Sequence, residues 1–246
     1  MGEEKKKTDW AEMIHLFPEK KQIDQSRLVS RLEKPKGKVD VILDTDTYNE
    51  IDDQFALAYL IKSDDKLNLE AIYAAPFYNH HSSGPGDGME KSYQEIMKVL
   101  DLMERPEFKE VTYRGSTMYL PSEEEAVDSP AARDLVRRAM ERDEDNPLYV
   151  VAIGAITNIA SAILLEPEII KKIVVVWLGG NALEWHDNHE FNLYQDVAAA
   201  RIIFGSGVPL VQLPCMGVVS AFATTGPELT YWLKGKNAMC DYLLEN

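Results

Sequence analysis

Residues 41–60 read VILDTDTYNEIDDQFALAYL, and this stretch decides the fold prediction. Its apolar start continues from Val39 and predicts a buried strand over residues 39–43. Four aspartates follow, at positions 44, 46, 52 and 53, and the last two open a segment that predicts a helix over residues 52–62. A buried strand, a polar loop and a helix in this order are typical of the first half of a βαβ unit.

The same alternation continues along the chain to residue 213. Further strands are predicted at residues 67–75, 111–113, 148–153, 173–178 and 208–213, and further helices near residues 88–103, 130–142, 157–165 and 195–204. This order predicts an α/β fold with a mainly parallel, doubly wound sheet that carries helices on both faces. Ligands of such sheets bind beyond the carboxyl ends of the strands.

The chain divides at Pro35 and Gly37. Residues 1–37 are polar and predict an N-terminal extension that packs on the domain surface through an amphipathic stretch around Trp10, Met13, Ile14 and Phe17. Residues 38–246 predict one domain, because 246 residues with 45% hydrophobic content suit one large α/β unit.

The composition argues against several classes of partner and of site. The formal net charge of −15 disfavours nucleic acid and anionic membranes. Cys215 and Cys240 form no CxxC pair, so neither a disulfide framework nor a zinc knuckle is predicted. The sequence has no apolar run of membrane-spanning length, and we expect a soluble, cytoplasmic protein.

The carboxylates after the first strand indicate a cation site. Asp44 and Asp46 are two residues apart on an extended segment and share a face, and a short loop brings Asp52 or Asp53 beside them. Carboxylates packed in this way are partly protonated unless a cation compensates their charge, which favours a hard divalent ion. The alternative is that Asp52 and Asp53 cap a helix, but this leaves Asp44 and Asp46 unexplained.

Two families begin in this way. An apolar strand that ends in DxD resembles the haloacid dehalogenase-type phosphatases, in which the first Asp is the nucleophile and magnesium the cofactor. That family has Thr or Val where this chain has Tyr48. DxD followed by a loop and DD resembles the nucleoside hydrolases, although the loop here, Thr47 to Ile51, is two residues longer than is usual and offers Asn49 to the site.

Three further segments in the same order favour the nucleoside hydrolases. They are PFYN, which ends at Asn79; AIGAITNIASAILLEPEII, which contains Thr157; and WLGGNALEWHDNHEFNLYQDVAAARIIF, which contains Glu190 and Asn192. The resemblance implies a Ca²⁺ site made by Asp46, Asp53, the main-chain carbonyl of Thr157, and Asp44. It also implies that Asp52, Asn79, Glu190 and Asn192 bind ribose hydroxyls. Read without the resemblance, Asp196 in this last segment is better explained as a helix cap.

The reaction that the resemblance implies is calcium-dependent hydrolysis of the N-glycosidic bond of ribonucleosides, as in purine and pyrimidine salvage, with Asp46 as the general base. A family Asn is replaced here by Glu184, and Asn181 or Asn188 is the expected substitute. Candidates for protonating or stacking on the leaving base are His80, His81, His186, His189 and Trp185.

The last segment departs from the family pattern. Residues 226–246 begin with Gly-Pro and predict one helix to the end, and no His-Asp or Trp-Asp pair follows the last strand to supply the family's final calcium ligand. We therefore expect a domain that lacks its C-terminal part, binds calcium weakly and hydrolyses nucleosides slowly or not at all, whereas a longer natural form would do both. The alternatives are the phosphatase and a non-catalytic nucleoside- or metal-binding homologue; a homo-oligomer is left open.

Overall fold

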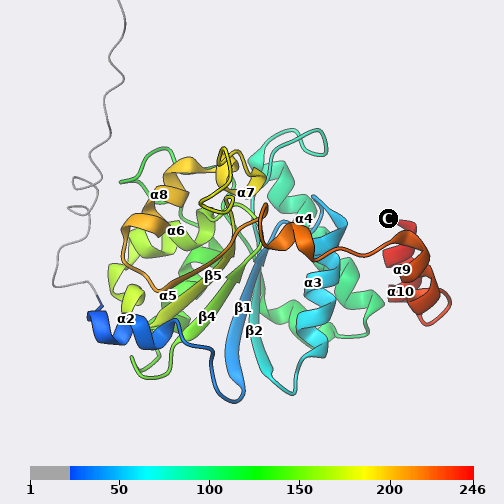
Figure 1. Cartoon of the computed structure of the whole chain (residues 1–246), viewed down its shortest axis with the longest axis horizontal. Coiled ribbons are helices and arrows are strands. Elements are labelled where there is room, and N and C mark those ends of the chain that lie inside the picture. Colours follow the sequence, from blue (N-terminus) through cyan, green and yellow to red (C-terminus); the bar gives the residue numbers. More distant parts are fainter. Residues whose placement is uncertain (1–22) are drawn as a thin grey trace, which may run out of the picture.

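The structure is a computed structural model and describes residues 23–246 (Figure 1). The amphipathic stretch predicted around Trp10 to Phe17 lies outside these residues. The described part begins at helix α2 (Gln25–Arg31), whose first turn is capped by the side chain of Asp24. No helix in this part of the chain has the length and apolar character needed to cross a membrane.

Six parallel strands form one sheet in the order β3-β2-β1-β4-β5-β6. The strands are β1 (Val39–Thr45), β2 (Leu67–Ala74), β3 (Thr112–Arg114), β4 (Leu148–Ala152), β5 (Ile173–Leu178) and β6 (Leu210–Leu213). The predicted parallel α/β architecture is confirmed. The strand order reverses between β1 and β4, where an α/β sheet opens a crevice at the carboxyl ends of its strands.

Helices cover both faces of the sheet (Figure 1). One face packs on α3 (Ile51–Lys62), α4 (Pro85–Leu102) and α10 (Ala238–Glu245), and the other on α5 (Pro130–Met140), α6 (Thr157–Leu165) and α8 (Val197–Gly205). Side chains of β1 alternate accordingly: Val41 and Leu43 join the first core, and Ile42 joins the second. Among residues 23–246, three short 3₁₀ helices complete the connections, at Pro106–Val111, Pro167–Lys171 and Val219–Ala221.

The helices and strands begin and end close to the predicted residues. β5 and α6 begin and end at the predicted residues, and the helix predicted at residues 195–204 corresponds to α8, which follows a short helix that was not predicted, α7 (Phe191–Gln195). Asp196 separates them, and its side chain caps α8 by accepting from the Ala199 N–H. The capping role predicted for Asp196 is confirmed.

The prediction of one continuous helix over residues 226–246 is wrong. The segment forms α9 (Gly226–Leu233) and α10, because Gly235 adopts a φ of +70° and Asn237 begins a new helix by capping the Cys240 N–H. α10 buries Met239 and Leu243 in the core shared with α3 and α4. The end of the described chain therefore packs against the helix that carries Asp52 and Asp53.

Candidate functional site

Three of the predicted carboxylates lie together at the carboxyl end of β1. Asp44 lies in β1, Asp46 follows the strand, and Asp53 lies in the first turn of α3; their side chains are 0%, 1% and 5% exposed. This edge lies between β2 and β4, at the reversal of strand order. The structure thus brings these residues to the crevice where ligands of such sheets bind.

Most of the oxygens of Asp44 and Asp46 have no hydrogen-bond partner. Asp44 Oδ2 accepts from Asn158 Nδ2 at 2.8 Å, but Asp44 Oδ1 and both oxygens of Asp46 are buried and unpartnered within the described chain. Buried polar atoms without partners are costly, and most native proteins pair them with protein groups, water or an ion. These three oxygens are therefore the strongest sign of a binding site.

The raised pKa values of these carboxyl groups also indicate a binding site. Burial raises the pKa of Asp44 to about 7, although the Asn158 hydrogen bond opposes the shift. Burial also raises the pKa of Asp46 well above its usual range, and the neighbouring charges of Asp44 and Asp52 add to the effect. Burial and the charge of Asp46 likewise raise the pKa of Asp53. The cluster holds protons at pH values where isolated carboxylates are ionised, unless a cation balances it.

The donor set fits a hard cation, but the ligands are not assembled as a finished metal site. Over residues 23–246, no three acidic, histidine or cysteine side chains converge in a metal-binding arrangement. One reason is that Asp53 Oδ1 accepts a hydrogen bond from the Thr45 hydroxyl. Gly154 approaches Asp46 closely, because a Cβ at Gly154 would lie only 2.7 Å from Asp46 Oδ1. Carboxylate oxygens are the ligands that Ca²⁺ and similar ions prefer, and these oxygens have no competing hydrogen bond.

The longer loop after Asp46 brings in Asn49, as the sequence allowed. Asn79 Nδ2 donates to Asn49 Oδ1 at 2.6 Å, which joins the loop after β2 to the loop after β1. Asp52 is exposed, and its Oδ1 accepts from the Asp53 N–H at 3.1 Å. The N-cap of α3 is Glu50, whose side chain makes no capping bond. Asp52 and Asp53 thus both lie in the first turn of α3, where the helix dipole favours acidic side chains, as the capping alternative predicted.

Glu190 and Asn192 are buried and bonded to the backbone. The carboxylate of Glu190 accepts from the N–H groups of Gly180 at 2.7 Å, Asn192 at 3.0 Å and Leu193 at 2.9 Å. Asn192 Nδ2 donates to the carbonyls of Ile153 and Leu178, both at 2.9 Å, just beyond β4 and at the end of β5. These contacts fix α7 at the carboxyl edge of the sheet.

Glu190 also faces the acidic side of the site. Partial burial raises the pKa of the Cys215 thiol, and the charges of Glu190, Glu50 and Asp52 raise it further. Those three carboxylates therefore lie around one thiol. The structure places Glu190 near Asp52 even though its oxygens are engaged with N–H groups.

Asn181 and Asn188 organise the loop between β5 and α7. The Asn181 N–H donates to Asn188 Oδ1 at 2.6 Å, and Asn181 Oδ1 accepts from the Met216 N–H at 3.2 Å. Asn181 is buried, whereas Asn188 is exposed. Their bonds hold the loop against the segment that follows β6.

The candidate leaving-group residues lie on the surface. His80 and His81 are exposed with ring centroids 3.8 Å apart, and His186 pairs with Asp187 at 2.9 Å. The His189 ring lies 5.3 Å from Tyr194, and Trp185, which is 40% exposed, lies beside His186. In the described chain none of these five side chains hydrogen-bonds to Asp44, Asp46 or Asp53.

Thr157 is buried at the start of α6, and its hydroxyl donates to Asp196 Oδ2 at 2.7 Å. Asp196 Oδ2 also accepts from the Leu120 N–H at 2.9 Å. Asp196 thus couples the loop after β3 to the residue whose carbonyl is expected to bind calcium. This coupling adds a tertiary role to the predicted cap.

Sequence reasoning missed the role of Asn158. Its Oδ1 accepts from the N–H and hydroxyl of Ser116 at 2.7 and 2.9 Å, and its Nδ2 donates to Asp44 Oδ2 and to the Ala74 carbonyl. An amide within the apolar segment TNIASAILL is the signal that was available. Asn158 therefore fixes Asp44 relative to β2 and to the loop after β3.

Tyr119 is a second residue that was missed. Its hydroxyl donates to Gln195 Oε1, which also accepts from the Tyr78 N–H at 2.7 Å. Burial raises the pKa of Tyr119, and the charges of Asp46 and Asp196 raise it further. Position 119 lies in a loop, so no periodicity could have indicated it.

Comparison with known proteins relates this arrangement to enzymes. Residues 41–243 match the family described as inosine-uridine preferring nucleoside hydrolase. The pyrimidine-specific ribonucleoside hydrolase RihA of Salmonella paratyphi A is 28% identical over 195 residues, which cover 70% of this chain and 58% of that protein. The chain thus matches well under two thirds of the length of its curated relatives.

Solved structures agree in fold. A purine-preferring ribonucleoside hydrolase from Gardnerella vaginalis superposes with a TM-score of 0.67 and 26% identity, covering 84% of this chain and 70% of that one. The type III effector protein XopQ, solved with adenosine diphosphate ribose, has a TM-score of 0.64 and 18% identity, covering 91% and 70%. At that identity the second likeness concerns the fold alone.

Proposed function

The chain belongs to the inosine-uridine preferring nucleoside hydrolase family, and from this premise we propose that it hydrolyses the N-glycosidic bond of ribonucleosides with Ca²⁺ as its cofactor. The observation that carries the proposal is the set of three partnerless, buried carboxylate oxygens on Asp44 and Asp46 at the switch point of the sheet. The family is metal-dependent, and calcium is the ion whose preference for oxygen ligands suits this donor set.

Asp44, Asp46, Asp53 and the Thr157 carbonyl would hold the ion. Bound there, calcium supplies Lewis-acid polarisation of the ribose diol and of a nearby water. The fit rests on the unpartnered oxygens, and the close approach of Gly154 to Asp46 admits no side chain between them. Asp53 contributes once its oxygen is released from the Thr45 hydroxyl.

Asp46 is the proposed general base, because both of its oxygens lack a competing hydrogen bond. It takes the proton of the attacking water as the water oxygen bonds to the anomeric carbon. The bond from that carbon to the base nitrogen breaks, and its electron pair leaves with the base. One displacement of this kind inverts the anomeric centre.

Polar groups around the carboxylates are the proposed ribose ligands. Asn79 and Asn49 are linked at the mouth of the loops after β2 and β1, and Asp52 is exposed beside them. Glu190 and Asn192 complete the proposed set, and their bonds to the backbone hold them rigid. Asn181 and Asn188 act through the loop that they fasten.

Departure of the base requires a proton or a stacking surface. We assign this role to the group of His80, His81, His186, His189 and Trp185, whose exposed positions on two loops leave them free to close over a substrate. RihA is called pyrimidine-specific and the Gardnerella enzyme purine-preferring, so relatives differ in base preference. We propose a cytoplasmic role in purine and pyrimidine salvage.

A non-catalytic nucleoside- or metal-binding protein is the second candidate. It is favoured by the bonds that commit Glu190 and Asn192 to backbone groups and by the near-complete burial of Asp46. The phosphatase has no support from the comparisons. It is retained only as one outcome of the assay.

The deciding experiment measures reducing sugar released from inosine and from uridine, with calcium and with a chelator, and phosphate released from p-nitrophenyl phosphate. We expect sugar release that requires the metal and is lost in Asp46→Asn. Phosphate release without sugar would select the phosphatase. Calorimetric binding of calcium with neither product would select the non-catalytic protein.

A further inference from the structure

A hollow of about 420 Å³ lies at the opposite edge of the sheet, where β1 and β4 begin. Its lining includes Arg31, Lys34, Lys36, Lys38, Asp145 and Tyr149. None of the carboxylates at the carboxyl edge of β1 contributes to it. The hollow is therefore separate from the candidate catalytic site and has no role in the proposed reaction.

Arg31, the last residue of α2, is the unusual group in this hollow. Its side chain is only 8% exposed, and its Nη1 and Nη2 have no hydrogen-bond partner within the described chain. Burial lowers the pKa of Arg31, and the charge of Arg27 lowers it further, yet a guanidinium stays charged at neutral pH. A buried charge without acceptors is costly, so the arrangement calls for an acceptor that the described residues do not supply.

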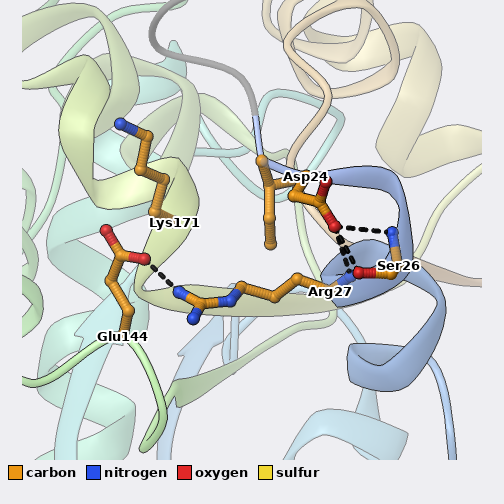
Figure 2. Close-up of a pocket in the computed structure, with 6 residues that line it drawn as sticks. Asp24, Ser26, Arg27, Glu144 and Lys171 are labelled. Carbon is orange, nitrogen blue, oxygen red and sulfur yellow. Dashed lines mark hydrogen bonds and ion pairs between the residues drawn. The ribbon is translucent and has the colours of Figure 1, made fainter.

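Glu144, Asp145 and Asp40 already accept hydrogen bonds from other side chains. Glu144 and Asp145 both accept from Arg27, and Figure 2 shows the contact between Arg27 and Glu144. Asp40 accepts from Arg142 at 2.7 Å and from Asn68 at 2.8 Å. None of these three carboxylates hydrogen-bonds to Arg31, whose Nη1 and Nη2 have no partner within the described chain.

The surrounding charge is positive against the trend of the molecule. The hollow is lined by four cationic side chains, Arg31, Lys34, Lys36 and Lys38, and by three acidic ones, Glu33, Asp40 and Asp145, a small positive excess in a chain whose net charge is −15. Among residues 23–246, no ion pair involves Lys34, Lys36 or Lys38. A hollow lined by lysines without ion pairs and by an arginine without hydrogen-bond partners attracts an anion.

We propose that this hollow binds the phosphate group of a small molecule, with Arg31 as the central donor and Lys34, Lys36 and Lys38 as the surrounding charges. A guanidinium offers paired N–H groups that match two phosphate oxygens, and such charge-assisted bonds are strong. The volume is larger than one ion requires and falls within the range of small-molecule sites. It leaves room for a sugar or nucleoside joined to the phosphate, beside Tyr149.

The test is calorimetric titration of the whole chain, free of divalent cations, with inorganic phosphate and separately with ribose 5-phosphate. Ionic strength is held constant with sodium chloride. We expect saturable binding that falls about tenfold or more in Arg31→Met, which keeps the aliphatic stem but removes the donors. Arg133→Met is the matched control, because Arg133 is exposed on α5 and pairs only with Asp128.

The two ligands distinguish the sources of phosphate. Equal affinity assigns the site to free phosphate, and tighter binding of ribose 5-phosphate assigns it to a phosphorylated metabolite. If Arg31→Met does not fold, the double variant Lys34→Met with Lys36→Met serves instead, with an expected loss of about threefold to tenfold. Absence of binding at millimolar phosphate, or full affinity in a folded Arg31→Met, would overturn the proposal. Neither result depends on nucleoside hydrolysis.

Discussion

Asp46 differs from Asp44 and Asp53 in having neither side-chain oxygen hydrogen-bonded. Asp44 is held by Asn158, and Asp53 by Thr45. A side chain without fixed partners is free to serve a ligand or a proton. For this reason we propose Asp46, and not its neighbours, as the general base.

Replacing Asp46 by Asn keeps the size of the side chain but removes its ability to accept a proton. We expect the turnover of inosine or uridine to fall about 10²- to 10⁴-fold, with the thermal midpoint changed little or raised. Steady-state sugar release and circular dichroism measure the two effects. Asp64→Asn, at an exposed turn, is the matched control and should keep full activity. Near wild-type turnover in a folded Asp46→Asn would remove Asp46 from this role.

The raised pKa of Asp44 has a consequence for stability in the absence of metal. The folded protein holds a proton on Asp44 up to about pH 7, whereas the unfolded chain releases it near its ordinary value of 3.8. The stabilisation is therefore complete below about pH 4 and is lost as the pH rises through 7.

Denaturant unfolding in chelator should therefore show Asp44→Asn gaining stability relative to the wild type between about pH 4 and pH 8. Adding calcium should stabilise the wild type more at the upper end of this range, because the cation replaces the proton. A difference between variant and wild type that does not change with pH would show that Asp44 ionises normally.

At the scale of elements, the turn between β4 and α6 controls the space beside Asp46. A Cβ at Gly154 would approach Asp46 Oδ1 to 2.7 Å and the Ala75 Cβ to 3.1 Å. The turn is thus restricted to glycine by tertiary packing, since its φ is not in the left-handed region.

Gly154→Ala should displace the Asp46 carboxylate and weaken calcium binding by about tenfold or more, because cation sites tolerate little misplacement of their ligands. Isothermal titration of calcium measures the loss. Gly226→Ala, where no atom lies within 4 Å of the added Cβ, is the control and should bind as the wild type does. Unchanged affinity in Gly154→Ala would place the cation away from Asp46.

At the scale of the whole molecule, α10 ties the end of the described chain to the site-bearing half of the fold. Met239 and Leu243 join the core beneath α3 and α4, and the Tyr242 hydroxyl donates to the buried Glu95, which also accepts from Gln54 of α3. α10 is therefore part of the same packed body as the acidic cluster.

Leu243→Ala should lower the free energy of unfolding by about 2–4 kcal/mol, because it opens a cavity in that core. Trp232→Ala, at a side chain that is 62% exposed on α9, should change it by less than about 0.5 kcal/mol. Urea unfolding followed by circular dichroism compares the two variants. A loss below about 1 kcal/mol for Leu243→Ala would mean that α10 does not unfold together with the sheet.

The sequence alone determined the sheet, the helices on its two faces and the edge at which Asp44, Asp46 and Asp53 gather. Those features follow from local periodicity and from strands that must be buried on both faces. The break at Gly235 was missed because its neighbours are good helix formers, and a single glycine is a weak signal against them.

Tertiary structure decided which oxygens stay free. Position in the sequence brings Asp46 and Asp53 to one edge, but only packing turns Asp53 toward Thr45, commits Glu190 to three N–H groups and leaves Asp46 unpaired. Likewise, the Arg31 guanidinium has no hydrogen-bond partner in the described chain, while the nearby Glu144 and Asp145 accept hydrogen bonds from Arg27. Hydrogen-bond partners come from residues far apart in the chain, and no local pattern records which of several donors reaches an acceptor first.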